Sequence, residues 1–372
     1  MEGPIRILIV NGKMICGGVE AFIMNIYRHI DRSKIQFDFL VHYKERFFYD
    51  DEIEALGGRI HRLSFRNDNR YFKYKSDLKR FFGEHPEYRV VWGHMDGLAS
   101  IYLKAAKKCG VSVTMSHSHI TSAERSLKGL VKRVLRGNLC KYADRRFACS
   151  TEAGRYLYGK HDFKVMPNAI AVEKFGFDPE ARARIREANG WQGKTVVGHL
   201  GRFNPQKNHL YLIDIFKAYL KRDPDAVLCL CGDGELQGSV RDYVAQCGLE
   251  DKVTFTGNIS NANEYYQAFD MFVMPSLYEG LPVSGVEAQT AGLRCYFADT
   301  ITRETSLVPQ NVRFLSIKQD PAAWAEVLEK TDEATRAATF DTVAASEYNI
   351  QKLVEMLEKL LTDEYNNKKE NL

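Results

Sequence analysis

The segment 276–292 reads SLYEGLPVSGVEAQTAG and combines a loop, a helix start and two carboxylates in a fixed order. The apolar run at 271–275 predicts a buried β-strand, and Pro282 favours the first turn of a helix that ends near the final glycine. We therefore expect Glu279 just before the helix and Glu287 about two turns along it. The backbone amides between them would be free to bind a phosphate, although a plain loop and a solvated helix explain this segment equally well.

The stretch GRFNPQKN at 201–208 places two cations ahead of another predicted helix. It follows a run at 195–201 that predicts a strand, and the helix after it carries apolar residues on one face. Arg202 can form two parallel hydrogen bonds to phosphate oxygens, and Lys207 supplies a mobile positive charge beside a leaving group. The pair suits a diphosphate, whereas alone it is more often surface charge.

These two stretches together resemble the donor site of retaining glycosyltransferases of family 4. The likeness rests on Glu279 and Glu287 with seven residues between them, on Gly-Leu-Pro after the first glutamate, and on the cations of 201–208. The resemblance implies an α/β protein with two Rossmann-like domains that face one another across a cleft, the GT-B arrangement. It also implies transfer of a sugar from a nucleotide diphosphate sugar to a hydroxyl with retained anomeric configuration, without a cofactor or a bound metal.

The resemblance further implies roles for single residues. Glu279 would be catalytic, together with a histidine discussed below. The residues that would bind the donor are Gly17, Gly18, Arg202, Lys207, Ile259, Gly280, Leu281 and Glu287. Ile259 follows a predicted strand at 253–257, where members of the family place backbone groups against the nucleotide base.

The first half of the chain begins with a strand, a glycine loop and a helix. The strand at 5–10 is followed by Gly12, Gly17 and Gly18, and then by a helix with one apolar face. Such a loop lets backbone approach a phosphate or a sugar, but a tight turn without a ligand fits as well. Because the loop is not GxGxxG, it does not favour a dinucleotide. Gly12 is an acceptor-side candidate.

Histidines follow two predicted parallel strands of the first half. His94 comes after the strand at 90–92, and His117 and His119 come after the strand at 111–115. Open α/β sheets bind ligands at the carboxyl ends of their strands, although single histidines there are often structural. The resemblance implies that a histidine after the second strand approaches the donor sugar. We select His117, which is nearer the strand end, and retain His94 and His119 as acceptor-side candidates.

The alternating strands and helices indicate two domains of similar plan. We place an acceptor-binding domain at 1–167, to which a final helix at about 348–362 returns, and a donor-binding domain at 168–347. The return of that helix is implied by the resemblance.

Composition is that of an ordinary soluble protein. The chain of 372 residues is 45% apolar and 27% charged, and its formal charge of +4 is too small to predict nucleic-acid binding. The eight cysteines lack CxxC pairs and metal-ligand spacing, so we expect reduced thiols and a cytoplasmic location. We expect no signal peptide and no membrane-spanning helix.

One segment, 122–147, is strongly basic. Only Glu124 and Asp144 oppose its cations, which are Arg125, Lys128, Lys132, Arg133, Arg136, Lys141, Arg145 and Arg146. Leucines and valines recur between them at helical spacing. A basic amphipathic helix can dock on an anionic membrane surface or bind an acidic acceptor, and a solvated helix packed on the core is an equal alternative.

The most specific interpretation is a glycosyltransferase that uses a nucleotide sugar, with a UDP-sugar favoured. The acceptor would be a glycan or a lipid-linked glycan, as in bacterial exopolysaccharide or capsule assembly, and the enzyme would be cytoplasmic, at most peripheral on the membrane. Two alternatives remain open at this point. A sugar-nucleotide epimerase uses the same architecture without an acceptor, and a non-catalytic relic would only bind the donor.

Overall fold

The computed structural model describes residues 3–63, 71–119 and 137–366. The chain divides into two compact units. The first unit comprises Met1–Ala169 together with Ile350–Leu372, and the second comprises Ile170–Asn349. Each unit is an α/β domain built around one parallel sheet, so the predicted fold class of two Rossmann-like domains is confirmed.

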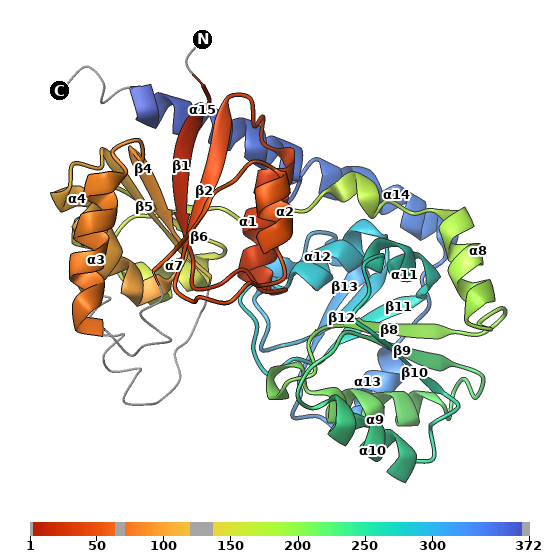
Figure 1. The fold of residues 1–372 in the computed structure, drawn as a ribbon. Helices are drawn as coiled ribbons and strands as arrows, with labels where there is room; N and C mark the ends of the chain where they lie inside the picture. The colour runs from red at the N-terminus through yellow and green to blue at the C-terminus, as the bar shows by residue number, and fades with distance from the viewer. Residues whose placement is uncertain (1–2, 64–70, 120–136, 367–372) are drawn as a thin grey trace. The chain divides into compact units, whose positions relative to one another are not determined.

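The sheet of the first unit has seven strands in the order β3-β2-β1-β4-β5-β6-β7 (Figure 1). The strands are β1 (Ile5–Val10), β2 (Ile35–Val41), β3 (Ile60–Arg62), β4 (Val90–Gly93), β5 (Val113–Ser118), β6 (Arg145–Ala148) and β7 (Lys164–Val165). Every paired neighbour runs parallel. Parallel strands are covered on both faces, which explains why β2, IQFDFLV, is buried along its whole length.

The helices of the first unit include the last helix of the chain. They are α1 (Gly18–His29), α2 (Asp50–Ala55), α3 (Tyr71–Glu84), α4 (Ala99–Lys108), α6 (Leu139–Tyr142), α7 (Thr151–Tyr158) and α15 (Ile350–Asn366). Helix α15 packs against α1, and the backbone amide of Asp31, just after α1, donates a 2.7 Å hydrogen bond to Glu358. Its buried side chains recur at helical spacing, so one apolar face of the helix packs on this unit.

The sheet of the second unit has six parallel strands in the order β10-β9-β8-β11-β12-β13. The strands are β8 (Val196–Leu200), β9 (Val227–Cys231), β10 (Val253–Gly257), β11 (Met271–Met274), β12 (Arg294–Ala298) and β13 (Val312–Leu315). The helices are α8 (Pro179–Ala188), α9 (His209–Tyr219), α10 (Gln237–Gln246), α11 (Ala262–Ala268), α12 (Val283–Thr290), α13 (Pro321–Val327) and α14 (Glu333–Ala344). A short 3₁₀ turn, η3 (Pro205–Lys207), precedes α9.

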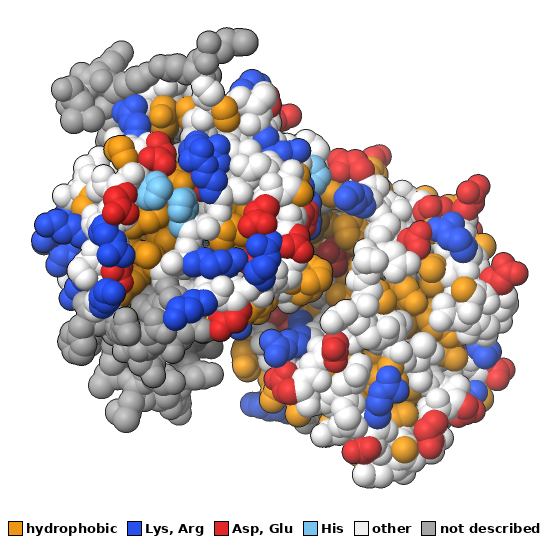
Figure 2. All heavy atoms as spheres, in the orientation of Figure 1, with side chains coloured by type: hydrophobic (Ala, Val, Ile, Leu, Met, Phe, Trp, Pro, Cys, Tyr) orange, Lys and Arg blue, Asp and Glu red, His pale blue; other side chains and the backbone are white. Residues whose placement is uncertain are grey.

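Charged side chains of both signs are interspersed on the face drawn in Figure 2. Neither the positive nor the negative side chains form a continuous patch over the described residues of that face. This mixture agrees with the small formal charge of +4.

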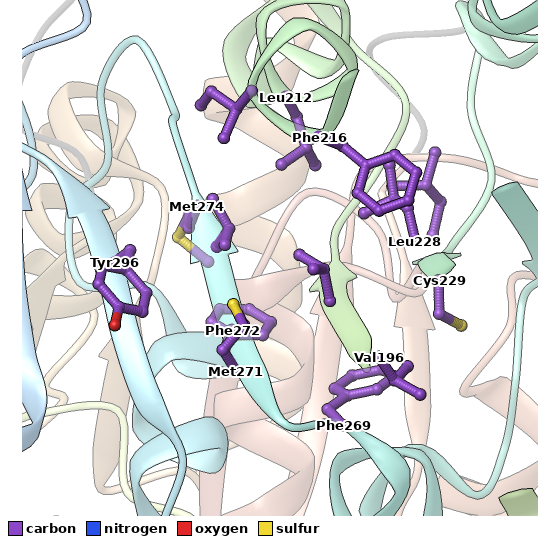
Figure 3. Packing of buried hydrophobic residues seen from close by; sticks show 14 of the residues in the cluster. Val196, Leu212, Phe216, Leu228, Cys229, Phe269, Met271, Phe272, Met274 and Tyr296 are labelled. Carbon is purple, nitrogen blue, oxygen red and sulfur yellow. The ribbon is translucent and has the colours of Figure 1, made fainter. Parts of the chain in front are cut away.

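The core of the second unit includes buried side chains of β8, β9, β11, β12 and α9 (Figure 3). Phe269, Met271 and Phe272 are fully buried around the central strand. On the neighbouring strand, a Cβ atom at Gly198 would lie 2.1 Å from the Phe269 ring, so glycine is required there for the ring to pack. Burial of each large apolar side chain contributes about 1.5 to 3 kcal/mol.

In both sheets the strand order reverses next to the first strand of the unit. β1 lies between β2 and β4, and β8 lies between β9 and β11. Loops that follow the strands at such a reversal leave a crevice at their carboxyl ends, which is where open α/β sheets bind ligands. The segments 201–208 and 275–282 leave β8 and β11, so they meet at one edge of the second sheet.

Two local expectations are corrected by the structure. Helix α12 begins at Val283, because Pro282 adopts an extended ψ of 112° and occupies the capping position. Glu287 is therefore little more than one turn into the helix, instead of two turns. Strand β5 extends to Ser118 because it pairs with β6, so His117 lies within the strand and opposite Phe147.

Gly292, two residues beyond the end of α12, offers a test of this packing. Its φ is +75°, and a Cβ atom there would lie 2.4 Å from the Cα of Arg336 in α14. Gly248 has a similar φ of +66° with open space around it. We expect Gly248→Ala to cost about 1 to 2 kcal/mol of unfolding free energy, from backbone strain alone. Gly292→Ala should cost about 3 kcal/mol or more, because the helix backbone must also move.

Urea unfolding of the two variants and the parent chain measures these costs. Equal losses in both variants would show that the close approach of α14 to Gly292 is absent in solution.

Candidate functional site

An ion pair between Lys207 and Glu279 stands at the carboxyl edge of the second sheet. Lys207 Nζ lies 2.7 Å from Glu279 Oε1, and the two side chains are only 13% and 9% exposed. An ion pair sheltered in this way is screened less by salt than a surface pair. The structure thus joins two of the residues predicted to bind and activate a donor.

Backbone and amide hydrogen bonds hold the two loops of this pair together. Gln206 donates from Nε2 to the Tyr278 carbonyl oxygen at 2.9 Å and to Glu279 Oε2 at 3.1 Å. Its own carbonyl oxygen accepts from the amide of Leu277 at 2.8 Å. Asn208, in the left-handed conformation with φ +57°, donates from its side chain to the Pro275 carbonyl at 3.1 Å. The Glu279 carboxylate is therefore held by Gln206 and Lys207, which both lie on the 201–208 segment.

Arg202 is not brought into this pair. Its guanidinium lies 3.1 Å from Glu235 Oε2, and its side chain is 64% exposed. The turn at 232–234 supports the segment next to it, because the amide of Phe203 donates to Asp233 and a Cβ atom at Gly232 would lie 2.2 Å from the Gly201 carbonyl oxygen. In this conformation Lys207 and Arg202 do not share a partner.

Two buried histidines, His199 and His209, flank Lys207 and were not predicted from the sequence. Their rings lie 5.0 Å apart edge to face, and His209 stacks on Phe203 with 4.1 Å between centroids. Burial is the main cause that lowers both pKa values, with Lys207 adding to it, and the pKa of His209 falls to about 4. Both rings are thus neutral near pH 7. The position of His199 at the end of a strand was a signal that could have found it.

Glu287 lies in the first half of α12, where Tyr266 donates a 2.8 Å hydrogen bond to its Oε2. Loss of water around the carboxyl raises its pKa to about 7, and the bond from Tyr266 opposes this shift. The residue as a whole is partly exposed.

The other predicted donor residues of the second unit are arranged around α12 and β10. Leu281 is buried with Val286 in an apolar cluster, whereas Gly280 is partly exposed between Glu279 and the helix start. Ile259 is partly buried and packs on the edge of the core. Gly280 is thus the one that leaves backbone near the ion pair accessible.

In the first unit, His94, His117 and His119 form one cluster. His94 Nδ1 lies 2.9 Å from His119 Nε2, and the rings of His117 and His119 stack with centroids 4.2 Å apart. Burial is the main cause that lowers all three pKa values, that of His119 to about 3, so the rings are neutral. His117 is fully buried, whereas His119 is partly exposed. Exposure therefore favours His119 over His117 for contact with a ligand.

The glycine loop of the first unit is held by polar contacts. Gly17 caps α1 in an extended conformation, and a Cβ atom there would lie 2.5 Å from Glu20 Oε2. Asn11 donates a 3.0 Å hydrogen bond to the other carboxyl oxygen of Glu20. Gly18 faces open space, and the nearest atom to a Cβ at Gly12 would be the Met95 methyl at 3.7 Å. Backbone at Gly18 is thus accessible.

Comparison with known proteins decides the family. The model described as "Glycosyltransferase Family 4" matches residues 16–174, and "Glycosyl transferases group 1" matches residues 181–339. The "Putative glycosyltransferase EpsF" of Bacillus subtilis is 34% identical over 340 residues, which are 89% of this chain and 88% of that protein. The chain belongs to the family 4 glycosyltransferases.

This glycosyltransferase is also similar to a second relative over part of its length, and to a solved structure. A galactosyltransferase of Escherichia coli, "UDP-Gal:alpha-D-GlcNAc-diphosphoundecaprenol alpha-1,3-galactosyltransferase", is 33% identical over 135 residues, or 35% of each chain. The structure of Anabaena HepE in complex with UDP is similar with a TM-score of 0.80 at 17% identity, over 96% of this chain and 100% of that one. The fold of this glycosyltransferase is GT-B.

The predicted basic segment of the glycosyltransferase lies mainly outside the described residues, which resume at 137. In its described part, Lys107 pairs with Asp144, and Arg145 donates a 2.6 Å hydrogen bond to Glu364 of α15. Among the described helices, none is sufficiently long and apolar to cross a membrane. Whether the segment docks on lipid stays a prediction.

The raised pKa of Glu287 predicts a pH-dependent stability. Folding raises this pKa from an ordinary value of 4.5 to about 7, so the folded protein binds more protons than the unfolded chain between these values. Protonation of Glu287 therefore stabilises the folded protein, and this contribution to the free energy of unfolding is fully present below pH 4.5. It is lost as pH rises to 7. Glu287→Gln cannot ionise and should be more stable than the parent above pH 7, by on the order of 1 kcal/mol. Near pH 4.5 the difference should be smaller.

Urea unfolding at several pH values measures this difference. Tyr266→Phe is the matched variant, because it keeps the ring but removes the hydrogen bond that lowers the Glu287 pKa. This variant should raise the Glu287 pKa of the folded protein, so stability should continue to fall up to a higher pH than in the parent. A difference between Glu287→Gln and the parent that does not change with pH would refute the assignment.

Proposed function

We propose that this glycosyltransferase transfers a sugar from a nucleotide diphosphate sugar, with a UDP-sugar favoured, to a hydroxyl of a glycan or lipid-linked acceptor with retention. The observation that carries the proposal is the sheltered Lys207–Glu279 pair at the strand ends of the second unit, beside the start of α12. Exopolysaccharide or capsule biosynthesis is the process we favour. Its support is the similarity to EpsF over most of the chain.

The chemical role we give to Lys207 is stabilisation of the leaving diphosphate. Negative charge grows on the diphosphate oxygen as the bond to the sugar breaks, and a sheltered cation stabilises that charge more than an exposed one. We propose that the first amides of α12, the helix that follows β11, add the favourable end of the helix dipole. No metal is required by this scheme, and we propose that the diphosphate is bound without one.

Glu279 and Glu287 receive different roles in the proposal. For Glu279, which Gln206 and Lys207 contact, the proposed role is to stabilise positive charge that develops at the sugar carbon. Glu287 is further along α12 and partly exposed, which suits hydrogen bonds from the ribose hydroxyls. We further propose that His119 or His117 contacts the donor sugar, with the greater exposure of His119 in its favour.

The donor base and the acceptor are proposals that rest on relatives. The E. coli relative uses UDP-Gal and a diphosphoundecaprenol-linked acceptor by its name, and HepE was solved with UDP. For the membrane, the support is the charge of 122–147 in the sequence. A cytoplasmic enzyme that docks on anionic lipid through this segment would reach a lipid-linked acceptor.

Incubation with UDP-, GDP- and ADP-sugars, with and without an undecaprenyl-diphosphate-linked acceptor, tests the function. A transferase releases nucleoside diphosphate at a rate that depends on the acceptor and forms an α-linked product from an α-linked donor. Interconversion of sugars without an acceptor would show an epimerase. Binding of a nucleotide sugar with no turnover under any condition would show a non-catalytic protein.

Removal of either cation should weaken use of the donor. Each of Lys207→Ala and Arg202→Ala removes charge-assisted hydrogen bonds of about 1.5 to 3 kcal/mol, so kcat/KM should fall roughly tenfold to a hundredfold. Lys207→Ala should also lower the free energy of unfolding, because it leaves the Glu279 carboxyl group without its cation. Arg202 is mostly exposed, so its variant should keep the parent stability.

Lys217→Ala, an exposed lysine on α9, is the control and should match the parent in rate and stability. Parent kinetics in both site variants, with every donor that is turned over, would eliminate the proposed phosphate contacts.

The two glutamates should give different kinetic defects. Glu279→Gln keeps the hydrogen-bonding shape but removes charge beside a carbon that becomes cationic, so it should lower kcat more than it weakens nucleotide binding. Glu287→Ala removes hydrogen bonds to the ribose, so affinity for the free nucleoside diphosphate should fall together with affinity for the donor. Calorimetry with the nucleoside diphosphate and steady-state rates measure the two effects. Equal binding losses in both variants with unchanged kcat would refute this division of roles.

A further inference from the structure

Several ring nitrogens in the cluster of His94, His117 and His119 lack a hydrogen-bond partner among the described residues. The bond between His94 and His119 uses one nitrogen of each ring. His94 Nε2, His119 Nδ1 and both nitrogens of His117 are buried and have no hydrogen-bond partner among the described residues. A buried polar atom without a partner costs about 1 to 3 kcal/mol, so such a cluster calls for a ligand that accepts nitrogen lone pairs.

The backbone places these three imidazole rings close together, in an arrangement that suits coordination of a single ion. His117 and His119 are two residues apart on β5 and its extension, so their side chains point to the same face of the sheet. His94 follows β4, the neighbouring parallel strand, in which Gly93 pairs with Ser116. One ring nitrogen from each histidine can be selected so that all three lie within 4.8 Å of one another.

The walls of the cluster restrain the rings. Phe22 contacts His117 edge-on at 4.9 Å between centroids, and Trp92 lies parallel to His117 at 6.0 Å.

We propose that His94, His117 and His119 bind a divalent transition-metal ion, for which Zn²⁺ is the best match, through one imidazole nitrogen each. Zinc takes neutral histidine nitrogens at about 2.0 to 2.1 Å in tetrahedral geometry, which sets neighbouring nitrogens roughly 3.4 Å apart. The widest separation in the cluster, at most 4.8 Å, must shorten by up to about 1.4 Å to reach this spacing. The fourth position is left for water or a ligand.

This site is distinct from the proposed diphosphate site, which Lys207 and Glu279 form in the other unit. In the proposed scheme the charge of the diphosphate is offset by Lys207 and not by this ion. The same rings are our candidates for contact with the donor sugar, and an imidazole nitrogen that coordinates zinc cannot also bond to a sugar hydroxyl. Bound zinc is thus an inhibitor of transfer. This consequence rests on the proposed function, whereas metal binding itself does not.

Zinc binding to the full chain, freed of any histidine tag and stripped of metal, tests the site directly. Competition with a chromophoric chelator should give one tight equivalent per chain, and Co²⁺ should give the visible bands of tetrahedral nitrogen coordination. His94→Ala and His119→Gln should each weaken zinc binding by at least about 100-fold, since even outer contacts of such sites are worth 10- to 100-fold. His161→Ala, an exposed histidine of the same unit, should bind as the parent does.

Circular dichroism of each metal-free variant checks the fold, and the Co²⁺ spectrum of the parent does not depend on any variant folding. Parent-like binding in both cluster variants, or no binding to the parent at micromolar zinc, overturns the proposal. Activity provides a separate readout: turnover should persist in EDTA and fall when zinc is added. Turnover that is lost in EDTA and restored by zinc would overturn the inhibitory role, and inactivity with intact zinc binding would count against the proposed function alone.

Discussion

The constraint that organises this protein is that both sheets are wholly parallel and covered on both faces. Strands in such sheets are apolar along most of their length, so functional polar groups concentrate where the strands end. β8 and β11 are neighbours at the reversal of strand order in the second unit, and their following loops supply Lys207 and Glu279. β4 and β5 are neighbours in the first unit, and they supply the three histidines. One geometric rule therefore accounts for the placement of both clusters.

The two clusters differ in charge: one is an ion pair and the other is a group of neutral histidines. Lys207 and Glu279 are ionic partners, and a bound diphosphate would compete with Glu279 for the lysine charge. His199 and His209 beside them are kept neutral, mainly by burial, so they add bulk but no charge near the lysine. In the first unit, burial keeps all three histidines neutral, which leaves nitrogen lone pairs in place of charge. The first arrangement suits an anion, and the second suits a soft cation or a hydroxyl group.

The proposed donor site is supported mostly by hydrogen bonds of backbone groups and side-chain amides. These bonds explain how short loops can keep the site in place. Gln206 bonds to both Tyr278 and Glu279, and Asn208 adopts a left-handed conformation that lets its side chain reach Pro275. Gly292 then ends the segment, with no room for a Cβ atom against α14. A glutamate on an unsupported loop would lose the precise orientation that catalysis requires. The site is thus built from residues whose contacts cross between loops.

Much of this protein was determined by the sequence alone, because the signals are local. Apolar runs and glycine turns predicted the alternating elements, and the residues of 201–208 and 276–292 predicted the family and the fold. Only the tertiary structure decided that Lys207 meets Glu279 across 72 positions of sequence while Arg202 meets Glu235. It also decided that β5 includes His117 and that His94 bonds to His119 across 25 positions. Such contacts depend on which strands become neighbours and how side chains share the space at their ends, and that is a property of the whole sheet, which no short stretch of sequence contains.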